Sequence, residues 1–294
     1  MPFPNVWMER RIIAYAHQGG AWERPSSTLA AIEHALEVGA NAIELDVHAT
    51  SDGQLVVCHD TTVDRTTNGS GPIAEMTLAE LRRLDPAYWF IPGADVTPGR
   101  PAEEYPYRGR GPGDPMFRIA TLDEVLERFP GVVLNLDIKR TAPVVQPYEA
   151  TLAQVLRKYA RRDDVIVASF LDPSTEAFHR AAPEIPTSAG TMTVAAFWRA
   201  LQQDESPPTL EHCALQVPER RGDLVIVDER FVAAAHAQGV AVHVWTVNQR
   251  EAMERLVNLG VDGIFTDLPT TLRACLDDTG VAWAPPGTTG GGQN

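Results

Sequence analysis

Two acidic residues share one face of a short apolar segment. In AIELDV (42–47), Glu44 and Asp46 alternate with aliphatic residues, so an extended chain points both carboxylates to the same side. If this segment is a barrel strand, that side is the interior, where two carboxylates are costly unless something compensates them. A divalent cation takes carboxylate oxygens as ligands, and the alternative is an ion pair with a neighbouring basic residue. For two acids so close together we favour the metal.

A second segment repeats the arrangement. In LNLDIKR (134–140), Asn135, Asp137 and Lys139 share one face. Taken alone, an Asp–Lys pair at this spacing is more often structural. On the strand that follows the acidic pair, Asp137 becomes a candidate third metal ligand, and Lys139 places a positive group beside it. The two segments together predict a site for a metal and an anion.

Two histidines lie where barrel enzymes keep their active-site residues. His17 ends the first predicted strand, just before Gly19 and Gly20, and His59 is followed by Asp60. Barrel active sites lie at the carboxyl ends of the strands, and histidine gives and takes protons near neutral pH. We therefore expect His17 and His59 at the site, and we interpret His48 as a bystander at the adjoining turn.

Strand-like runs alternate with amphipathic helical patterns almost to the end of the chain. This alternation predicts a parallel sheet with helical crossovers. Eight such runs fit a closed (β/α)₈ TIM barrel, and the alternative open sheet is disfavoured because no spaced-glycine signature follows the first strand. The predicted strands are 12–16, 41–47, 132–138, 164–170, 184–190, 213–217, 240–247 and 262–267.

Two further runs do not fit as barrel strands. LVVCH (55–59) follows an Asp-Gly turn signal, which predicts a hairpin antiparallel to the second strand. LVIV (224–227) is short, and we interpret it as an extended connection. In VHVWTV (242–247), one face holds Val242, Val244 and Thr246, whose packing against helices would turn Trp245 inward.

The length of 294 residues, with 44% hydrophobic residues, suits one large barrel domain over residues 1–282. An insertion of about residues 60–118 interrupts it, and six Pro and five Gly in 91–115 predict irregular structure over the barrel mouth. The Gly-rich residues 283–294 are expected to form a flexible tail.

The net charge of −14, from 25 basic and 39 acidic residues, argues against a nucleic-acid partner. Three dispersed cysteines predict neither a disulfide framework nor a zinc site. No secretory signal and no apolar run of about 20 residues is present. We therefore expect a cytoplasmic protein with a small-molecule substrate and no stable membrane insertion.

Several motifs occur in order over about residues 11–272: AHQGG, ELDV with HD and TVDRTTNG, LNLDIK, ASF, VWTVN and GVDGIFTDLP. This ordered set resembles the glycerophosphodiester phosphodiesterases. The resemblance implies a TIM barrel with a small inserted segment after the second barrel strand, and hydrolysis of glycerophosphodiesters to glycerol 3-phosphate and an alcohol in glycerol and lipid metabolism. It also implies one divalent cation, Mg²⁺ or Ca²⁺, on Glu44, Asp46 and Asp137, an acid–base pair of His17 and His59, and substrate contacts from Gln18, Lys139 and Trp245.

The chain departs from the family pattern at three places. Gln18 replaces the usual Arg and removes a fixed charge with a bidentate phosphate grip. Ser26-Ser27 replaces Glu-Asn, and Asp137 stands where Glu is usual. Arg24 or Arg65 could replace the lost charge, and Glu23 the lost acid.

Two other functions stay open. A lysophospholipase D-type hydrolase would use the same site, and an apolar lining from residues 91–117 would support it, but that segment is mainly polar. A decayed barrel acting as a binding protein is motivated by Gln18 and Ser26-Ser27. The retained histidines and carboxylates argue against such decay.

Overall fold

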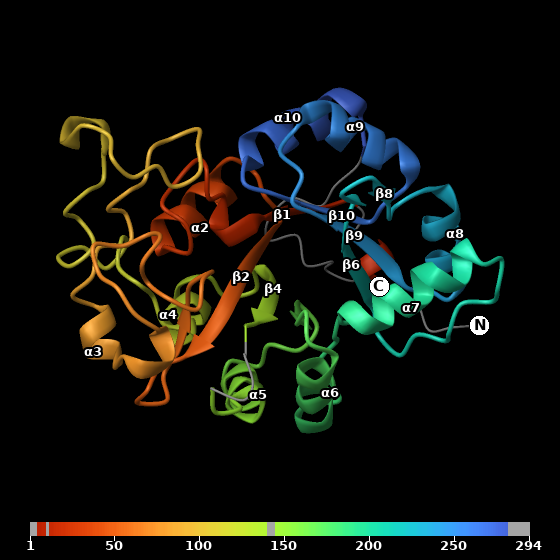
Figure 1. The fold of residues 1–294 in the computed structure, drawn as a ribbon, viewed down its shortest axis with the longest axis horizontal. Helices are drawn as coiled ribbons and strands as arrows, with labels where there is room; N and C mark the ends of the chain where they lie inside the picture. Colours follow the sequence, from red (N-terminus) through yellow and green to blue (C-terminus); the bar gives the residue numbers. More distant parts are fainter. Residues whose placement is uncertain (1–4, 10–11, 140–144, 282–294) are drawn as a thin grey trace, which may run out of the picture.

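The computed structural model describes residues 5–9, 12–139 and 145–281, and a curled sheet of parallel strands forms its centre (Figure 1). Seven strands are hydrogen-bonded in the order β5-β4-β2-β1-β10-β9-β6. They are β1 (Ile13–Ala16), β2 (Ala42–Ala49), β4 (Val133–Ile138), β5 (Val165–Ala168), β6 (Ala214–Pro218), β9 (Ala241–Trp245) and β10 (Gly263–Thr266).

The predicted strand 184–190 closes this sheet into a barrel. Thr187 forms a parallel bridge to Val167 of β5, and Ser188 forms one to Ala214 of β6. These two bridges join the ends of the seven-strand path, so each of the eight predicted strands occupies a barrel position. The (β/α)₈ prediction is confirmed.

Helices surround the barrel, as the alternating pattern predicts (Figure 1). Threonine or aspartate side chains cap three of them: Thr28 before α2, Thr121 before α4 and Asp228 before α8. The helices are α1 (Val6–Glu9), α2 (Leu29–Glu37), α4 (Leu122–Arg128), α5 (Glu149–Lys158), α6 (Asp172–Ala181), α7 (Thr191–Gln202), α8 (Glu229–Ala237), α9 (Arg250–Leu259) and α10 (Pro269–Thr279).

The barrel interior changes from apolar to polar along its axis. Tyr15 and Phe265 stack at 4.2 Å between ring centroids, and His243 lies fully buried beside them. Further along β2 and β4 the inward positions are polar, because Glu44 is in register with Asn135 and Asp46 with Asp137. The apolar end therefore fills the barrel, while the carboxyl ends of the strands carry the polar groups.

The parity of β9 follows the prediction only as far as the strand extends. Val242 and Val244 pack in the outer apolar cluster, and Trp245 lies on the inner side. The prediction that Thr246 packs against helices is wrong, since Thr246 lines a cavity, while the next residue, Val247, packs in the outer cluster. The reason is that β9 ends at Trp245, so strand alternation does not continue beyond it.

The hairpin predicted after the second strand is confirmed. β3 (Leu55–Val57) pairs antiparallel with β2, with Val47 opposite Val57. The chain then continues through η2 (Ile73–Glu75), α3 (Leu78–Leu81) and η3 (Ala102–Glu104) before it returns to α4. The run at 224–227 begins with β8 (Leu224–Val225), which pairs antiparallel with β7 (Arg220–Arg221).

The insertion supplies no residue to the lining of the cavity described below, and its expected position over the barrel mouth stays a prediction. It lies beside α2 in Figure 1, and the amide of Gly93 donates a hydrogen bond to the carbonyl of Trp22. Arg108 stabilises it from within, since its guanidinium lies 4.2 Å from the ring centroid of Tyr88 and 3.7 Å from that of Tyr105. The Gly93–Trp22 hydrogen bond thus ties the segment to the loop after β1, while the Arg108 contacts stabilise its interior. Its expected role as one part of a single domain stays a prediction, and the predicted tail lies outside the described residues.

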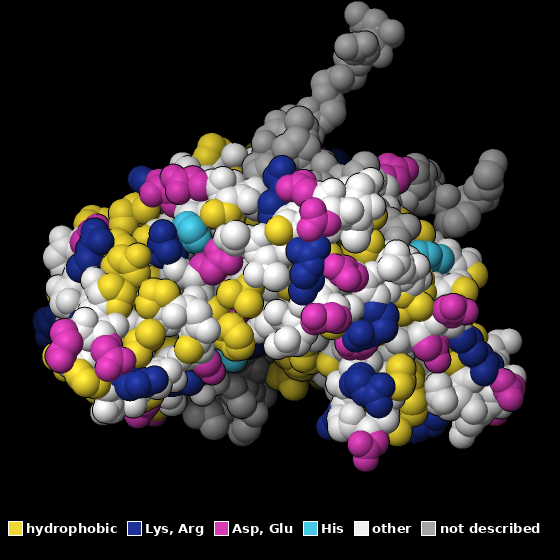
Figure 2. Space-filling view, turned by 90° about the horizontal axis from the view of Figure 1, so that it is seen from above, with side chains coloured by type: hydrophobic (Ala, Val, Ile, Leu, Met, Phe, Trp, Pro, Cys, Tyr) yellow, Lys and Arg dark blue, Asp and Glu magenta, His cyan; other side chains and the backbone are white. Residues whose placement is uncertain are grey.

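Ion pairs are frequent on the outer surface. On the face drawn in Figure 2, acidic and basic side chains are interspersed, and pairs such as Arg157–Glu184 and Arg128–Glu33 join neighbouring elements. None of the helices in the described ranges has both the length and the apolar character needed to span a bilayer.

Candidate active site

Three carboxylates lie together on neighbouring strands. Glu44 and Asp46 of β2 and Asp137 of β4 are 5%, 1% and 6% exposed, respectively. The structure thus brings the three predicted metal ligands to the same end of the barrel. Lys139 lies among them, with Nζ 2.8 Å from Asp46 Oδ1 and 2.9 Å from Asp137 Oδ2.

Burial controls the protonation of this cluster. Loss of solvation and the neighbouring charge of Asp46 raise the pKa of Glu44 to about 8, and burial raises the pKa of Asp137. For Lys139, burial alone would lower the pKa, but the carboxylates of Asp46 and Asp137 raise it above its usual value. The ammonium therefore stays charged and balances part of the negative charge.

Two carboxylate oxygens of the cluster have no hydrogen-bond partner in the described structure. They are Asp46 Oδ2 and Asp137 Oδ1, and both are buried. As the side chains lie, no group of three or more His, Cys, Asp or Glu residues within the described ranges is arranged to enclose a metal ion. Lys139 explains this arrangement, since it occupies the space between two of the acids.

His17 is held by a carboxylate from the opposite end of the sequence. In η1 (His17–Gly19), His17 Nδ1 lies 2.6 Å from Asp267 Oδ1, and its Nε2 lies 3.9 Å from Glu44 Oε2. Burial alone would lower its pKa, but the hydrogen bond to Asp267 and the charge of Glu44 raise the pKa to about 9. Asn248 fixes Asp267 in turn, because its Nδ2 donates to Asp267 Oδ2 at 2.7 Å.

His59 has the same kind of support from its immediate neighbour. Its Nδ1 lies 2.6 Å from Asp60 Oδ1, and Arg65 Nε donates to Asp60 Oδ2 at 2.6 Å. These contacts hold the pKa of Asp60 well below its usual range, although burial alone would raise it. The rings of His17 and His59 are 6.0 Å apart and nearly perpendicular. Two carboxylate-supported imidazoles thus lie close together beside the acidic cluster.

Gln18 and His48 contact this arrangement without lining the cavity described below. The backbone amide of Gln18 donates to Glu44 Oε2 at 3.0 Å, and its buried side chain places Nε2 3.3 Å from His17 Nε2. His48 is buried, with Nε2 3.4 Å from the carbonyl oxygen of His59, and burial lowers its pKa. The expectation that it lies at the turn is wrong, since His48 is in β2 and pairs with Val56 of β3, and its interpretation as a bystander stays a prediction.

The three candidate replacements for the missing family residues lie elsewhere. Glu23 accepts hydrogen bonds from His34 and Thr270, while Arg24 contacts the carbonyl of Glu23. Arg65 is engaged by Asp60 and does not line the cavity. None of the three side chains restores a charge beside the acidic cluster.

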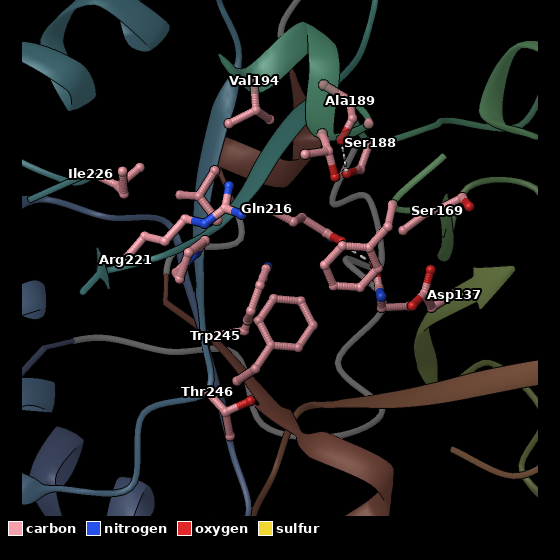
Figure 3. Close-up of a pocket in the computed structure, with 18 of the residues that line it drawn as sticks. Asp137, Ser169, Ser188, Ala189, Val194, Gln216, Arg221, Ile226, Trp245 and Thr246 are labelled. Carbon is pink, nitrogen blue, oxygen red and sulfur yellow. Dashed lines mark hydrogen bonds between the residues drawn. The ribbon is translucent and has the colours of Figure 1, made fainter. Parts of the chain in front are cut away.

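A cavity of about 870 Å³ opens above the carboxylates. His17, His59 and Lys139 lie at one end of its lining, and Gln216 donates to Asn135 Oδ1 at 2.7 Å in its wall. Figure 3 shows Asp137 on one side, and Val194, Ile226 and Arg221 on the other. The apolar lining residues include Phe170, Val194, Trp198, Leu224, Ile226 and Trp245.

The sequence analysis assigns no role to several residues that support the site or line the cavity. Asp267 and Asn248 belong to motifs that carry the family resemblance, and both are polar residues just after a strand. That position was a usable signal. The apolar wall from α7 and the β7–β8 hairpin has no such signal, because helical and hairpin residues reach the cavity only through the tertiary fold.

Comparisons with known proteins agree with this architecture. The family model described as "Glycerophosphoryl diester phosphodiesterase family" matches residues 17–271. A glycerophosphodiester phosphodiesterase of Bacillus subtilis is 32% identical over 272 residues, covering 90% of this chain and 86% of the Bacillus protein. A human protein named lysophospholipase D GDPD1 is 27% identical over 280 residues, covering 88% of this chain and 84% of the human protein.

A crystal structure from Silicibacter pomeroyi, described as a putative glycerophosphoryl diester phosphodiesterase, has the same fold. Its TM-score is 0.74 at 24% identity, covering 95% of this chain and 99% of that structure. The ordered motifs, the closed barrel and the family match thus lead to one assignment. The chain belongs to the glycerophosphoryl diester phosphodiesterase family of enzymes, as its motifs predict.

Proposed function

We propose that this protein hydrolyses glycerophosphodiesters to glycerol 3-phosphate and an alcohol, using one divalent cation and two histidines. The observation that carries the proposal is the pair of imidazoles 6.0 Å apart beside three buried carboxylates. Each imidazole has a carboxylate 2.6 Å from its Nδ1. This arrangement suits proton transfer at both sides of a phosphodiester held at the carboxyl ends of the strands.

Glu44, Asp46 and Asp137 are the residues that would hold the cation. The buried, unpartnered oxygens of Asp46 and Asp137 support this assignment, because a carboxylate oxygen without a hydrogen bond is costly in the interior. Oxygen ligands of this kind fit Mg²⁺ or Ca²⁺. When bound, such a cation neutralises nonbridging phosphate oxygens and acidifies an attacking hydroxyl.

The histidines carry the protons. One imidazole takes the proton of the attacking hydroxyl as its oxygen bonds to phosphorus, and the other gives a proton to the alcohol oxygen as the P–O bond breaks. The attacker is water, or the glycerol 2-hydroxyl through a cyclic phosphate. Hydrolysis in ¹⁸O-labelled water, with a search for cyclic phosphate, distinguishes the two routes.

Lys139 and Trp245 line the cavity and are the proposed substrate contacts. Lys139 supplies a charged group for the phosphate, and Trp245 supplies an apolar wall. Gln18 is buried and does not line the cavity, so we infer that it acts through the hydrogen bond from its backbone amide to Glu44 and through the contact of its Nε2 with His17 Nε2, rather than by gripping the phosphate directly.

The decisive experiment assays the purified chain on a panel of glycerophosphodiesters with added metals and measures glycerol 3-phosphate. We expect excess chelator to abolish turnover, and Glu44→Gln to prevent its recovery by Mg²⁺ or Ca²⁺. His17→Ala and His59→Ala should each lower the rate by about 10²–10⁴-fold. His179→Ala, on the exposed surface of α6, is the matched control and should keep the wild-type rate.

Three results would contradict the proposal. Full turnover in excess chelator would exclude the metal site. Near-normal rates for either His17→Ala or His59→Ala would remove that histidine from the mechanism. Lack of hydrolysis across the whole panel, with every metal, would favour a decayed barrel that only binds its ligand.

A lysophospholipase D-type activity on the same site is the second candidate, and the apolar cavity wall favours it. The sequence analysis sought this wall in residues 91–117, which do not line the cavity. The wall comes instead from residues such as Val194 and Trp198 of α7 and Ile226 beyond β8. Including lysophospholipids in the panel and comparing kcat/KM for the two substrate classes tests this alternative.

A further inference from the structure

Exposed large hydrophobic side chains gather at one edge of the barrel mouth. In the described part of the chain there are five of them, all on three segments. The segments follow β5, the closing strand segment around residues 187–188, and β6. Because these strands are neighbours and parallel, their following loops lie side by side. We call the set the apolar rim: Phe170 (51% exposed), Leu171 (40%), Met192 (72%), Leu224 (53%) and Val225 (41%).

The apolar rim is continuous with the cavity. Phe170 and Leu224 belong both to the rim and to the cavity lining. The Phe170 ring lies 5.3 Å from the Trp245 ring, and Trp198 Nε1 donates to the carbonyl of Val225 at 3.2 Å. A surface that covers the rim therefore also meets the entrance of the cavity.

Positive charge accompanies the apolar rim. Arg199, Arg220 and Arg221 are exposed and line the mouth of the cavity. Within the ranges that the structure describes, none of these three guanidinium groups forms an ion pair with a carboxylate, although Arg220 donates to the carbonyl of Asp223 at 3.1 Å. Asp223, in the turn between β7 and β8, adds one exposed carboxylate, so the three arginines leave an excess of positive charge at this site. This local excess of positive charge contrasts with the net charge of −14 of the whole chain.

We propose that the apolar rim and these three arginines form a docking surface for an anionic lipid surface. Apolar side chains enter the interfacial region of a bilayer, while nearby basic side chains contact lipid phosphates. Such docking is peripheral and needs no membrane-spanning segment. It brings the cavity entrance to the lipid surface, and it stands whether or not the proposed function is correct.

Charge complementarity favours lipid over a second copy of the chain. A two-fold interface places the same patch on both partners, so it would bring three unpaired arginines against the same three. An anionic surface instead neutralises them. The apolar rim adds the burial energy that charge alone does not supply.

The test uses the full-length chain with vesicles of phosphatidylcholine, and with vesicles in which part of it is replaced by phosphatidylglycerol. We expect co-sedimentation with the second kind, weakening as salt is added. The triple variant Leu171→Ser/Met192→Ser/Val225→Ser should lower binding by about tenfold or more. Arg220→Gln/Arg221→Gln should lower it by about tenfold and reduce its salt dependence.

The matched control is Arg128→Gln/Arg157→Gln. These arginines are also exposed, but they lie in the last turns of α4 and α5, at the other end of the barrel. This variant should bind vesicles like the wild type. The triple rim variant should hydrolyse a water-soluble glycerophosphodiester at the wild-type rate, since Leu171, Met192 and Val225 do not line the cavity.

Two outcomes would overturn the docking proposal. One is equal binding to both kinds of vesicle, or none to either. The other is wild-type vesicle binding by the triple rim variant. If rim variants change the oligomeric state in sedimentation without affecting vesicle binding, the rim is a contact between copies and the proposal is wrong. Because each readout is binding, a failure here is distinct from a failure of the hydrolysis assay.

Discussion

Replacing Asp267 by asparagine tests whether His17 needs a fixed tautomer. Asn248 holds Asp267 in one orientation: its Nδ2 donates to Asp267 Oδ2 at 2.7 Å, while its Oδ1 accepts from the Asp267 amide at 2.9 Å. The other oxygen, Asp267 Oδ1, lies 2.6 Å from His17 Nδ1. In the wild type, this oxygen accepts a hydrogen bond from Nδ1–H, so the proton that His17 gives or takes, with a pKa of about 9, is the one on Nε2.

The side-chain amide introduced by Asp267→Asn cannot satisfy both partners. If its oxygen accepts from Asn248, its NH₂ group faces His17 Nδ1, which must then lose its proton and transfer it to Nε2. If the amide turns over, two NH₂ groups face each other. The first orientation removes the tautomer needed for proton transfer, and the second keeps it only at the cost of the contact between the two NH₂ groups. Loss of the tautomer lowers kcat by about 10²–10⁴-fold. KM should change little, because Asp267 does not line the cavity.

A double variant distinguishes the tautomer from simple loss of packing. In Asn248→Asp/Asp267→Asn, the new carboxylate accepts from the new amide, which can then turn its oxygen to His17. We expect the double variant to recover about tenfold of the lost kcat. Steady-state kinetics on one glycerophosphodiester measures this, with thermal unfolding as the control for folding. A kcat for Asp267→Asn within a few-fold of the wild type would refute the reasoning.

Three further predictions concern stability, metal binding and the insertion. Burial lowers the pKa of His243 to about 3, whereas the unfolded residue titrates near 6.5. Because only the unfolded chain takes up this proton below about pH 6.5, the free energy of unfolding falls by about 2 kcal/mol between about pH 7 and pH 5. Urea unfolding at both pH values should show a smaller fall in His243→Asn. Lys139→Met should tighten Mg²⁺ or Ca²⁺ binding about tenfold by calorimetry, because the ammonium and the cation compete for the same carboxylates, and an unchanged Kd would exclude that competition. Arg108→Ala should destabilise the insertion by about 2 kcal/mol, from the loss of stacking on three rings, and speed limited proteolysis within 91–115, whereas digestion at the wild-type rate would contradict this role for the stacking.

The sequence predicts the barrel well because each strand signal is local. Alternation at Glu44 and Asp46 is enough to place both carboxylates inward, and the turn signal before residue 55 is enough to predict the hairpin. Even the segment around Thr187, which forms only isolated bridges, is recognisable from its place between two helical patterns. Periodicity and turn chemistry act over a few residues, so they can be read without tertiary contacts.

The location of the insertion and of the apolar cavity wall could not be predicted in this way. The insertion contacts the loop after β1 through the Gly93–Trp22 hydrogen bond, which joins residues far apart in the sequence, while Arg108 stacks on rings of the insertion itself. The cavity wall contains Val194 and Trp198, whose helical spacing is equally consistent with core packing. A polar composition in 91–117 therefore said nothing about the substrate, because that segment does not reach the cavity.

The two histidine–carboxylate pairs also differ in whether they are local in the sequence, and this difference affects how each histidine is held in place. His59 and Asp60 are adjacent in the chain, so their hydrogen bond forms wherever the local turn forms. His17 and Asp267 are 250 positions apart, and they meet only because β1 pairs with β10 when the barrel closes. The orientation of His17 thus depends on the first and last barrel strands being together, while that of His59 does not. Any change that loosens the β1–β10 pairing should therefore disable the site through His17 before it disturbs the carboxylates of β2 and β4, whose own pairing runs from Ala42–Val133 to Val47–Ile138.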